Sequence, residues 1–373
     1  MLTQLKSPMS PQNDPWEAID RRKQFGSNKL TSIEFTVTNL CNLRCEHCAV
    51  GDVLTMKDSE ERIPLPLIFQ RLDEIEHLDT LSITGGEPMF NQQIITDYIV
   101  PLLRYAHERG AKTQINSNLT LDLDRYEAIL PYLDVLHISF NYVDAQDFYR
   151  TAYVHKMHPV SFSQAEKTFN TMVENTIELA KRGVFVSAES LISEHTAGKL
   201  SRIHHIIKEL GCQRHEVHPL YPSDFARHMK ILSLAELRGV YNRLLDERDP
   251  DLWILFGTLP FYACNSSEED LALVKRMKDS HNVTVRNDPD GHNRLNTNIF
   301  TGEVIVTDFG DVEPLGNLRT DRLDDCFERW QKHSLFQPFN CYCPQSSCVG
   351  PNIIVADTYY RGIDFRERKG ISL

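Results

Sequence analysis

The stretch CNLRCEHC at residues 41–48 decides how the rest of the sequence is interpreted. It follows directly on TSIEFTVT, residues 31–38, an alternating run that predicts a β-strand. Cys41, Cys45 and Cys48 lie close enough in the sequence for one short loop to place three thiolates around an iron-sulfur cube. Thiolates select zinc or iron-sulfur centres, and a set of three leaves one coordination position open for a group that is not protein. An open position indicates chemistry.

The CxxxCxxC spacing after a first strand resembles the signature of the radical SAM (S-adenosylmethionine) superfamily. The resemblance implies that Cys41, Cys45 and Cys48 hold a 4Fe-4S cluster whose fourth iron binds SAM. It also implies that His47 stands where the family usually has an aromatic residue beside the adenine. Two other interpretations remain open, a zinc knuckle completed by His47 or a distant ligand, and three ordinary buried thiols.

The composition is that of an ordinary globular protein and restricts its partners. The 373 residues, 41% hydrophobic and 25% charged, suffice for one large domain and a smaller one. A net charge of -12 without a basic run argues against nucleic acid as the main partner. No apolar run is long enough for a membrane span and the first residues lack the apolar part of a secretory signal, so we expect a cytoplasmic protein.

The cysteines are 9 in number, which is odd, and most of them fall into two tight clusters. Three stand alone, namely Cys212, Cys264 and Cys326. This distribution indicates metal binding in a reducing compartment and does not suit a disulfide framework.

From residue 31 the sequence alternates strand-like and helix-like segments, which predicts repeated β-α units. The expected strands are 32–38, 80–86, 112–118, 135–141, 184–190 and 215–222. The helices expected between them include 67–78, 93–109, 163–182 (with a Ser163/Glu166 capping box and Gly183 after its end) and 200–210. Six such units predict an α/β fold in which a parallel sheet curls into a partial (β/α)6 barrel, similar to a TIM barrel. In such barrels the active site lies at the C-terminal ends of the strands.

We divide the chain into four parts: an N-terminal arm over the surface with a short helix near Trp16 (1–28), the radical SAM partial barrel (29–225), a connecting helical region (226–297) and a small C-terminal auxiliary-cluster domain (298–373). In the connecting region, Ser233 and Glu236 predict a capped helix, and the stretch 252–298 is predicted to be irregular. The last domain is predicted to hold a hairpin around Thr301-Gly302 and a helix at 323–332.

The turn Gly85-Gly86-Glu87-Pro88 ends the second predicted strand and matches the GGEP stretch of the radical SAM superfamily. Two glycines allow the backbone to approach a ligand closely. The Glu87 carboxylate suits the ammonium group of a bound methionine. A GGEP sequence by itself is also compatible with a simple turn, but its place after the CxxxCxxC motif and at a strand end favours SAM binding.

Polar residues at the ends of the later strands are further candidates for SAM contacts. Ser139 and Asn141 are two apart on a strand and therefore face the same side. They resemble ribose-contacting positions of the family, and Ser117 and Asn118 resemble a polar pair that also contacts SAM. Glu189 on the fifth strand needs a partner inside the barrel, which is SAM, substrate or a structural salt bridge. Short polar residues at strand ends are also common turn formers.

A second set of cysteines, Cys341, Cys343 and Cys348, forms a CxCxxxxC motif near the C-terminus. Such a dense set indicates a second metal centre, either another iron-sulfur cluster or zinc. The sequence leaves its fourth ligand open among Cys264, Cys326 and a substrate group.

The stretches TGEVIV (301–306) and GDVEPLGNL (310–318) resemble the SPASM or twitch extensions of radical SAM peptide-modifying enzymes. That pattern places a cysteine after Pro314, where this sequence has Leu315, which indicates one auxiliary cluster and not two. With both cysteine motifs and the GGEP turn, nearly the whole chain resembles the YfkAB-type radical SAM/CxCxxxxC proteins.

The resemblance implies an enzyme that reductively cleaves SAM at the first cluster and uses the 5′-deoxyadenosyl radical to abstract hydrogen from a peptide or small-molecule substrate. A reductant such as ferredoxin or flavodoxin would supply the electron, and the second cluster would transfer an electron or anchor the substrate. The alternatives are a non-catalytic iron-sulfur protein for electron transfer or cluster delivery, and a zinc-binding module. The sequence identifies no substrate, catalytic residue or oligomeric state, and leaves open whether SAM is consumed or regenerated.

Overall fold

The computed structural model describes residues 9–59, 61–264, 267–308 and 312–368, and its centre is one 11-stranded sheet. The strand order is β11-β10-β9-β1-β2-β3-β4-β5-β6-β7-β8. The strands are β1 (Ser32–Thr36), β2 (Thr80–Thr84), β3 (Lys112–Ser117), β4 (Val135–Ser139), β5 (Val186–Ile192), β6 (Arg214–Pro219), β7 (Trp253–Gly257), β8 (Val283–Arg286), β9 (Arg294–Asn298), β10 (Glu303–Ile305) and β11 (Gly316–Asn317). Each pair from β1 to β8 is parallel, and so is the pair β1 and β9, whereas β10 and β11 run antiparallel to their neighbours.

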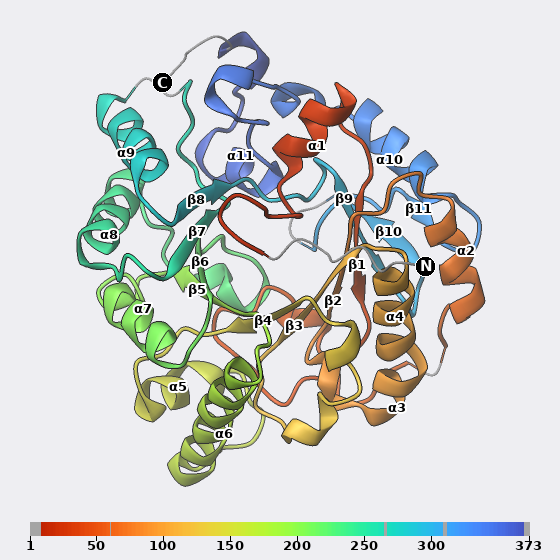
Figure 1. Ribbon diagram of the computed structural model, residues 1–373, viewed down its shortest axis with the longest axis vertical. Coiled ribbons are helices and arrows are strands. Elements are labelled where there is room, and N and C mark those ends of the chain that lie inside the picture. Colours follow the sequence, from red (N-terminus) through yellow and green to blue (C-terminus); the bar gives the residue numbers. More distant parts are fainter. Residues whose placement is uncertain (1–8, 60, 265–266, 309–311, 369–373) are drawn as a thin grey trace.

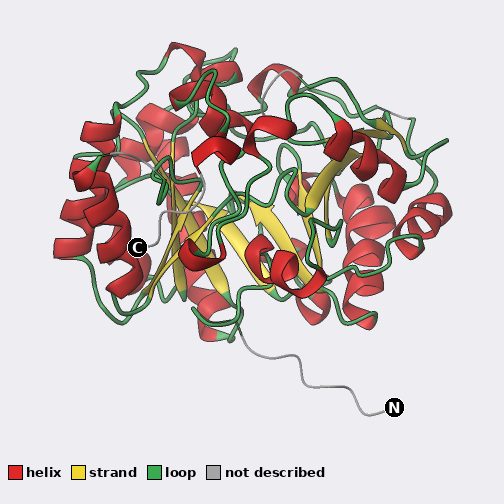
Figure 2. Cartoon of the chain, turned by 90° about the horizontal axis from the view of Figure 1, so that it is seen from above, coloured by secondary structure: helices red, strands yellow, loops and turns green. Residues whose placement is uncertain are grey.

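The sheet curls into a partial barrel, and most of the helices cover its outside (Figure 1). They are α1 (Ala18–Phe25), α2 (Leu65–Asp73), α3 (Gln92–Ile94), α4 (Val100–Glu108), α5 (Ala145–Ala152), α6 (Phe162–Lys181), α7 (Leu200–Glu209), α8 (Leu234–Glu247), α9 (Glu268–Asp279), α10 (Leu323–Lys332) and α11 (Ile353–Tyr359). Because β8 and β11 are the two edges of the sheet, the barrel is not closed. Figure 2 shows the strands between layers of helix when the chain is seen from above.

The predicted α/β partial barrel is confirmed, and its six predicted strands correspond to β1–β6 with ends shifted by a few residues. The prediction for 252–298 is wrong, since this stretch contains β7, α9, β8 and β9. Strands β7 and β8 continue the parallel series, and β9 pairs with the far side of β1. The sequence of β7, WILFG, is buried throughout and so lacks the alternation that marks a half-exposed strand.

The helix ends show which local signals were correctly assigned. The N-cap of helix α6 lies two residues earlier than predicted, because the capping box is formed by Ser161 and Gln164 and not by Ser163 and Glu166. It ends before Gly183, which has φ +82 and is the predicted glycine beyond the helix end. Helix α8 has its predicted cap, and α10 spans the predicted residues.

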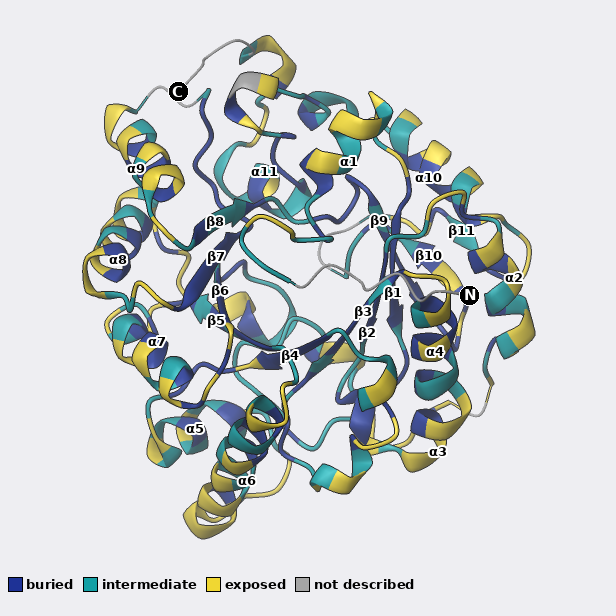
Figure 3. Cartoon of the chain, in the orientation of Figure 1, coloured by how far each residue is buried: buried dark blue, intermediate teal, exposed yellow. Residues whose placement is uncertain are grey.

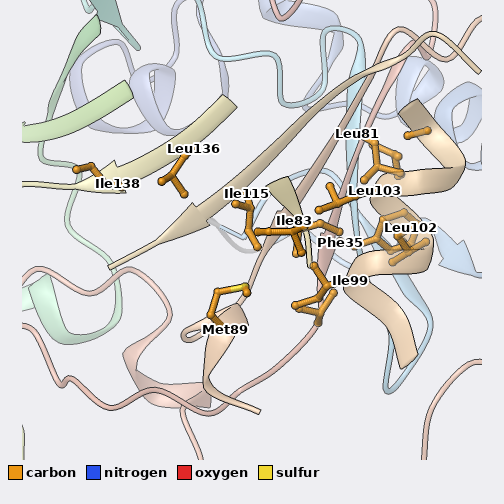
Figure 4. Close-up of a cluster of buried hydrophobic side chains, with 14 of the residues drawn as sticks. Phe35, Leu81, Ile83, Met89, Ile99, Leu102, Leu103, Ile115, Leu136 and Ile138 are labelled. Atoms are coloured by element: carbon orange, nitrogen blue, oxygen red, sulfur yellow. The ribbon is translucent and has the colours of Figure 1, made fainter. Parts of the chain in front are cut away.

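The outward face of the sheet is apolar and packs on the helices. Phe35 of β1, Ile83 of β2 and Ile115 of β3 lie against Leu102 and Leu103 of α4 (Figure 4). All five side chains are fully buried, whereas the outer faces of the helices are exposed (Figure 3). Burial of this apolar surface is the main stabilising contribution to the barrel.

The N-terminal segment lies inside the barrel, not over its surface as predicted. Trp16 is only 2% exposed, and its indole N–H donates to the Ser82 hydroxyl at 3.1 Å. Asp14 accepts a hydrogen bond from Arg286 of β8 at 2.7 Å. In Figure 1 this red segment crosses the centre of the strands. The first eight residues of the predicted arm lie outside the described residues.

The inward face of the sheet is charged, with Glu216 of β6 at the centre of a buried cluster. Glu216 Oε2 lies 3.0 Å from the guanidinium group of Arg214. Its other oxygen, Oε1, lies 3.0 Å from His218 Nε2 and also pairs with Arg286. Burial by itself would raise the pKa of Glu216, but Arg286 and Arg214 outweigh it and hold this pKa well below its ordinary value. The lumen therefore contains a cluster of buried charges of both signs.

The C-terminal part adds β9, β10 and β11 to the sheet, and the predicted hairpin is the β9-β10 pair, which turns at Gly302. Of the stretch 310–318, Gly310 and Asp311 lie outside the described residues.

The division of the chain into four parts stays a prediction. Among the described residues, every helix is too short or too polar to span a membrane.

Replacing Glu216 by Gln is expected to lower the free energy of unfolding by about 3–5 kcal/mol at neutral pH, because Arg214 and Arg286 lose their buried counter-charge. Anaerobic denaturant titration measures this change. The matched control is Glu209→Gln on the exposed end of α7, which should alter the unfolding free energy by less than about 0.5 kcal/mol.

The same pair of proteins tests the sign of the electrostatic effect. Because the folded-state pKa of Glu216 lies below the ordinary value of 4.5, its stabilising contribution is complete above that pH and declines as the pH falls below it. The stability difference between the wild type and Glu216→Gln should therefore narrow in acid. A difference of equal size at neutral pH and at about pH 3.5 would contradict this assignment.

Candidate active site

The cysteine loop after β1 and the glycine turn after β2 are joined through their backbones. The N–H groups of Gly86 and Glu87 donate to the carbonyls of Thr38 and Leu40 at 2.8 and 2.7 Å. A Cβ atom on Gly85, which has φ +148, would lie 2.4 Å from the Thr38 carbonyl oxygen. A Cβ atom on Gly86 would lie 2.3 Å from the carbonyl oxygen of Leu40. Only glycine permits this approach, so the two glycines position the cysteine loop itself.

Asp58 braces the start of the cysteine loop. Both of its oxygens lie 2.8 Å from the Thr38 hydroxyl, and one also accepts from the Asn39 N–H at 3.1 Å. The Thr38 hydroxyl oxygen in turn accepts from the Leu40 N–H at 3.1 Å. Asp58 was not predicted from the sequence, because no sequence motif identifies an aspartate whose hydrogen bonds stabilise a loop.

The three thiols of the loop are partly buried and close enough to influence one another. Burial raises the pKa of Cys41 to about 12, with contributions from Glu87 and Cys48, and the pKa of Cys45 is raised by burial and by both other thiols. The Leu43 N–H donates to Cys41 Sγ at 3.4 Å. Buried thiols of this kind become thiolates when a metal supplies the compensating positive charge.

The cysteine loop has one feature of an iron-sulfur site. Backbone N–H groups directed at thiolate sulfur are typical of iron-sulfur sites. Cys41, Cys45 and Cys48 therefore have the environment that a 4Fe-4S cluster requires.

Glu87 is fully buried and is held by the end of β3. It accepts hydrogen bonds from the Ser117 hydroxyl at 2.9 Å, the Asn118 N–H at 2.7 Å and the Met89 N–H at 3.1 Å. Burial raises its pKa to about 7 in spite of these three bonds. The carboxylate thus ties β2 to β3, and Pro88 begins the short 3-10 turn that follows it. Its contact with the ammonium group of SAM stays a prediction.

The structure brings Ser117 and Asn118 to the cysteine loop. The hydroxyl of Ser117 is turned toward Glu87 and Tyr126. The Asn118 side-chain amide donates to Asn42 of the cysteine loop at 2.9 Å, and the same nitrogen lies 3.9 Å from Cys41 Sγ. Asn118 therefore contacts the cysteine loop directly, whereas Ser117 contacts Glu87 of the neighbouring turn.

His47 and Asn141 lie together at the mouth of the barrel. The Asn141 amide nitrogen is 3.4 Å from His47 Nε2, and its oxygen accepts from the Leu191 N–H at 2.8 Å. Burial lowers the pKa of His47 to about 4, so the imidazole is neutral at pH 7. The two residues share one small pocket with parts of the loops that follow β5 and β6. Its lining comprises Glu46, His47, Asn141, Thr151, Leu191, Ser193, His195, Thr196, Lys199 and Met229.

Ser139 and Glu189 lie opposite each other on β4 and β5, and both face the lumen. Ser139 is exposed there, whereas Glu189 Oε2 lies 2.6 Å from His137 Nε2. Burial would raise the pKa of Glu189, but the hydrogen bond and charge of His137 leave it lowered. The sequence analysis missed His137, although its place two residues before Ser139 on the same strand puts it on the same face.

The second cysteine set is also brought together. Cys343 and Cys348 pair through their backbones, with N–O distances of 2.9 and 3.2 Å, and the Gly350 N–H donates to Cys348 Sγ at 3.3 Å. Cys341, Cys343 and Cys348 line one pocket, and Cys264 lines it with them.

Two regions of the chain match known families. Residues 35–188 match the Radical SAM superfamily, and residues 220–370 match the YfkB-like domain. The chain is 51% identical over 366 residues to protein YfkA of Bacillus subtilis (strain 168), and the match covers 98% of both chains. With the fold and the cysteine loop described above, the chain belongs to the radical SAM superfamily. Within that superfamily it belongs to the family of YfkA. Members of the superfamily bind SAM at a 4Fe-4S cluster, and these are the cofactors of this chain.

Solved structures of other proteins share the fold. Streptococcus suis SuiB bound to S-adenosylmethionine superimposes with a TM-score of 0.60 at 13% identity, over 90% of this chain and 76% of that chain. SuiB bound to the precursor peptide SuiA gives 0.58 at 14% identity, over 90% and 75%. The structure of anSMEcpe with bound AdoMet gives 0.57 at 12% identity, over 81% and 82%.

Replacing Gly86 by Ala is expected to separate the glycine turn from the cysteine loop, because the new Cβ meets the Leu40 carbonyl. We expect a loss of about 1–3 kcal/mol in unfolding free energy and less iron per chain after anaerobic reconstitution. The control is Gly198→Ala, where a Cβ meets nothing within 4 Å. Full iron incorporation in Gly86→Ala would show that the loop does not depend on this contact.

Proposed function

We propose that this chain is an enzyme that reductively cleaves SAM at a 4Fe-4S cluster held by Cys41, Cys45 and Cys48. When bound, the cluster and SAM supply a 5′-deoxyadenosyl radical, which abstracts hydrogen from a substrate in the barrel. The observation that carries the proposal is the fixed contact between the cysteine loop and the Gly85-Gly86 turn. It assembles both superfamily motifs at the C-terminal ends of β1 and β2, the rim that holds the active site in parallel barrels.

The residues around the mouth of the barrel would bind and orient SAM. His47 is neutral and lies in a pocket with Asn141, which suits an uncharged heterocycle such as adenine. Ser139 faces the lumen nearby and is exposed, so its hydroxyl is accessible to a ribose. Gly85, Gly86, Glu87 and Pro88 form the adjacent turn, which we assign to the methionine part of SAM.

The lumen would receive a polar substrate, a peptide or a small molecule. Glu189, His137 and His218 form hydrogen-bonded polar pairs on the inward face of the sheet, and a polar substrate suits these surroundings better than an apolar one. A peptide is supported by the shared fold with SuiB, which has been solved with a precursor peptide. No basic run accompanies the net charge of -12, so we do not assign nucleic acid as a partner.

The CxCxxxxC set would hold one auxiliary iron-sulfur cluster, and a reductant such as ferredoxin or flavodoxin would supply electrons to the enzyme. The cysteine usage suits a reducing compartment, for which we propose the cytoplasm. Exclusion of water and of oxidants from the buried cysteine loop is what the protein itself provides for this chemistry.

The test is anaerobic reconstitution with iron and sulfide, followed by dithionite reduction in the presence of SAM. Wild type is expected to produce 5′-deoxyadenosine, and Cys45→Ala is expected to produce none because its cluster lacks one of three ligands. The matched control is Cys212→Ala, a buried cysteine in the main hydrophobic core, which should retain 5′-deoxyadenosine formation.

The outcome also separates the alternatives. A wild-type protein that binds iron but forms no 5′-deoxyadenosine would favour a non-catalytic iron-sulfur protein. A colourless protein that binds zinc would favour a zinc-binding module. Formation of 5′-deoxyadenosine by Cys45→Ala would refute the assignment of this ligand set.

A further inference from the structure

We propose that Cys264 is the fourth ligand of the auxiliary cluster, so that this cluster is bound entirely by protein. The inference rests on the auxiliary cluster of the proposed function. It adds Cys264 to the ligands of that cluster and assigns the cluster to electron transfer. Cys264 follows β7 and is separated from the CxCxxxxC motif by most of the C-terminal region. The fold brings it back to the other three cysteines.

The four cysteines surround a common pocket. Its lining comprises Tyr262, Ala263, Cys264, Cys341, Cys343, Ser346, Cys348, Gly350, Phe365 and Arg368. Cys264, Cys341 and Cys348 also pack in one cluster of buried side chains with Tyr262 and Phe365. Four cysteines around one pocket supply the number of thiolates that a 4Fe-4S cluster bound entirely by protein needs.

The other candidate, Cys326, lies elsewhere. It is on α10, is fully buried, and belongs to the main hydrophobic core. Its sulfur packs against Gly316 of β11 and lies 4.0 Å from a guanidinium nitrogen of Arg329. It does not line the pocket of the CxCxxxxC cysteines. Cys326 is therefore a core residue, as most free cysteines are.

The charges around the pocket suit an anionic centre. Lys278 of α9 donates to the Ser346 carbonyl at 2.8 Å, inside the segment between Cys343 and Cys348. Arg368 is part of the pocket lining on the Cys264 side. A cubane with four thiolates carries a net negative charge that grows on reduction, so these cations stabilise it and favour its reduced form.

A fourth protein ligand fixes the role of the auxiliary cluster. With every iron bound to a cysteine, no coordination position is open to a substrate group. The cluster then cannot anchor the substrate by direct ligation, and its remaining function is to accept or donate an electron. This removes one of the two roles that the sequence allowed.

The test uses full-length protein in which Cys41, Cys45 and Cys48 are all replaced by Ala, so that only the auxiliary cluster remains. This parent is expected to bind about four irons after reconstitution and to stay EPR-silent after mild oxidation, because a fully ligated 4Fe-4S cluster keeps its iron. Adding Cys264→Ala should convert most of the cluster to the 3Fe-4S form, with its EPR signal, under the same oxidation. Adding Cys326→Ala instead should change nothing.

Cys264→Ser, which preserves the shape of the side chain, protects the test against a folding defect, and circular dichroism checks the fold of each variant. A reduced-state EPR spectrum of Cys264→Ser that is identical to that of the parent would overturn the assignment. So would an EPR-silent, four-iron Cys264→Ala. A parent that binds no iron would overturn the auxiliary cluster altogether, while 5′-deoxyadenosine formation by the wild type would still decide SAM cleavage separately.

Discussion

The close approach of two backbones at the ends of β1 and β2 is the constraint on which the site depends. Two short hydrogen bonds hold the cysteine loop against the Gly85-Gly86 turn, and neither position tolerates a Cβ atom. Glu87 accepts a hydrogen bond from the N–H of Asn118 at the end of β3. The side chain of Asn118 in turn donates to Asn42 of the cysteine loop. The first three strands thus position one loop, and a shift in any of their ends moves all three thiols together.

The interior of the barrel is polar along its length, which is costly unless every charge is compensated. Trp16 fills part of it, and Asp14 and Glu216 together neutralise Arg214 and Arg286 there. Toward the mouth, Glu189 and His137 remain next to the exposed Ser139. One part of the lumen is therefore satisfied by the protein itself, and the other presents polar groups to a ligand.

Local signals in the sequence were sufficient for much of the fold. Alternation gave β1–β6, and caps and periodicity gave α8 and α10, because these features depend on neighbouring residues. The burial of Asp14 could not be predicted, since its partner Arg286 lies far along the chain and no local pattern links them. Spacing identified the cysteine motifs, but Cys264 and Cys326 are both single cysteines in the sequence, and the fold shows which of them lines the pocket of the CxCxxxxC set.

The two family matches divide the chain in sequence but not in space. Beyond β5, the C-terminal half continues the sheet through β6, β7 and β8, and it returns to cover the opposite edge, where β9 pairs with β1. Without it, β1 and β5 would both present unpaired edges. The loop after β7 that carries Cys264 and the loop after β1 that carries Cys41 consequently belong to one continuous sheet. The continuous sheet therefore fixes the loop that carries Cys41 and the loop that carries Cys264 to the same frame.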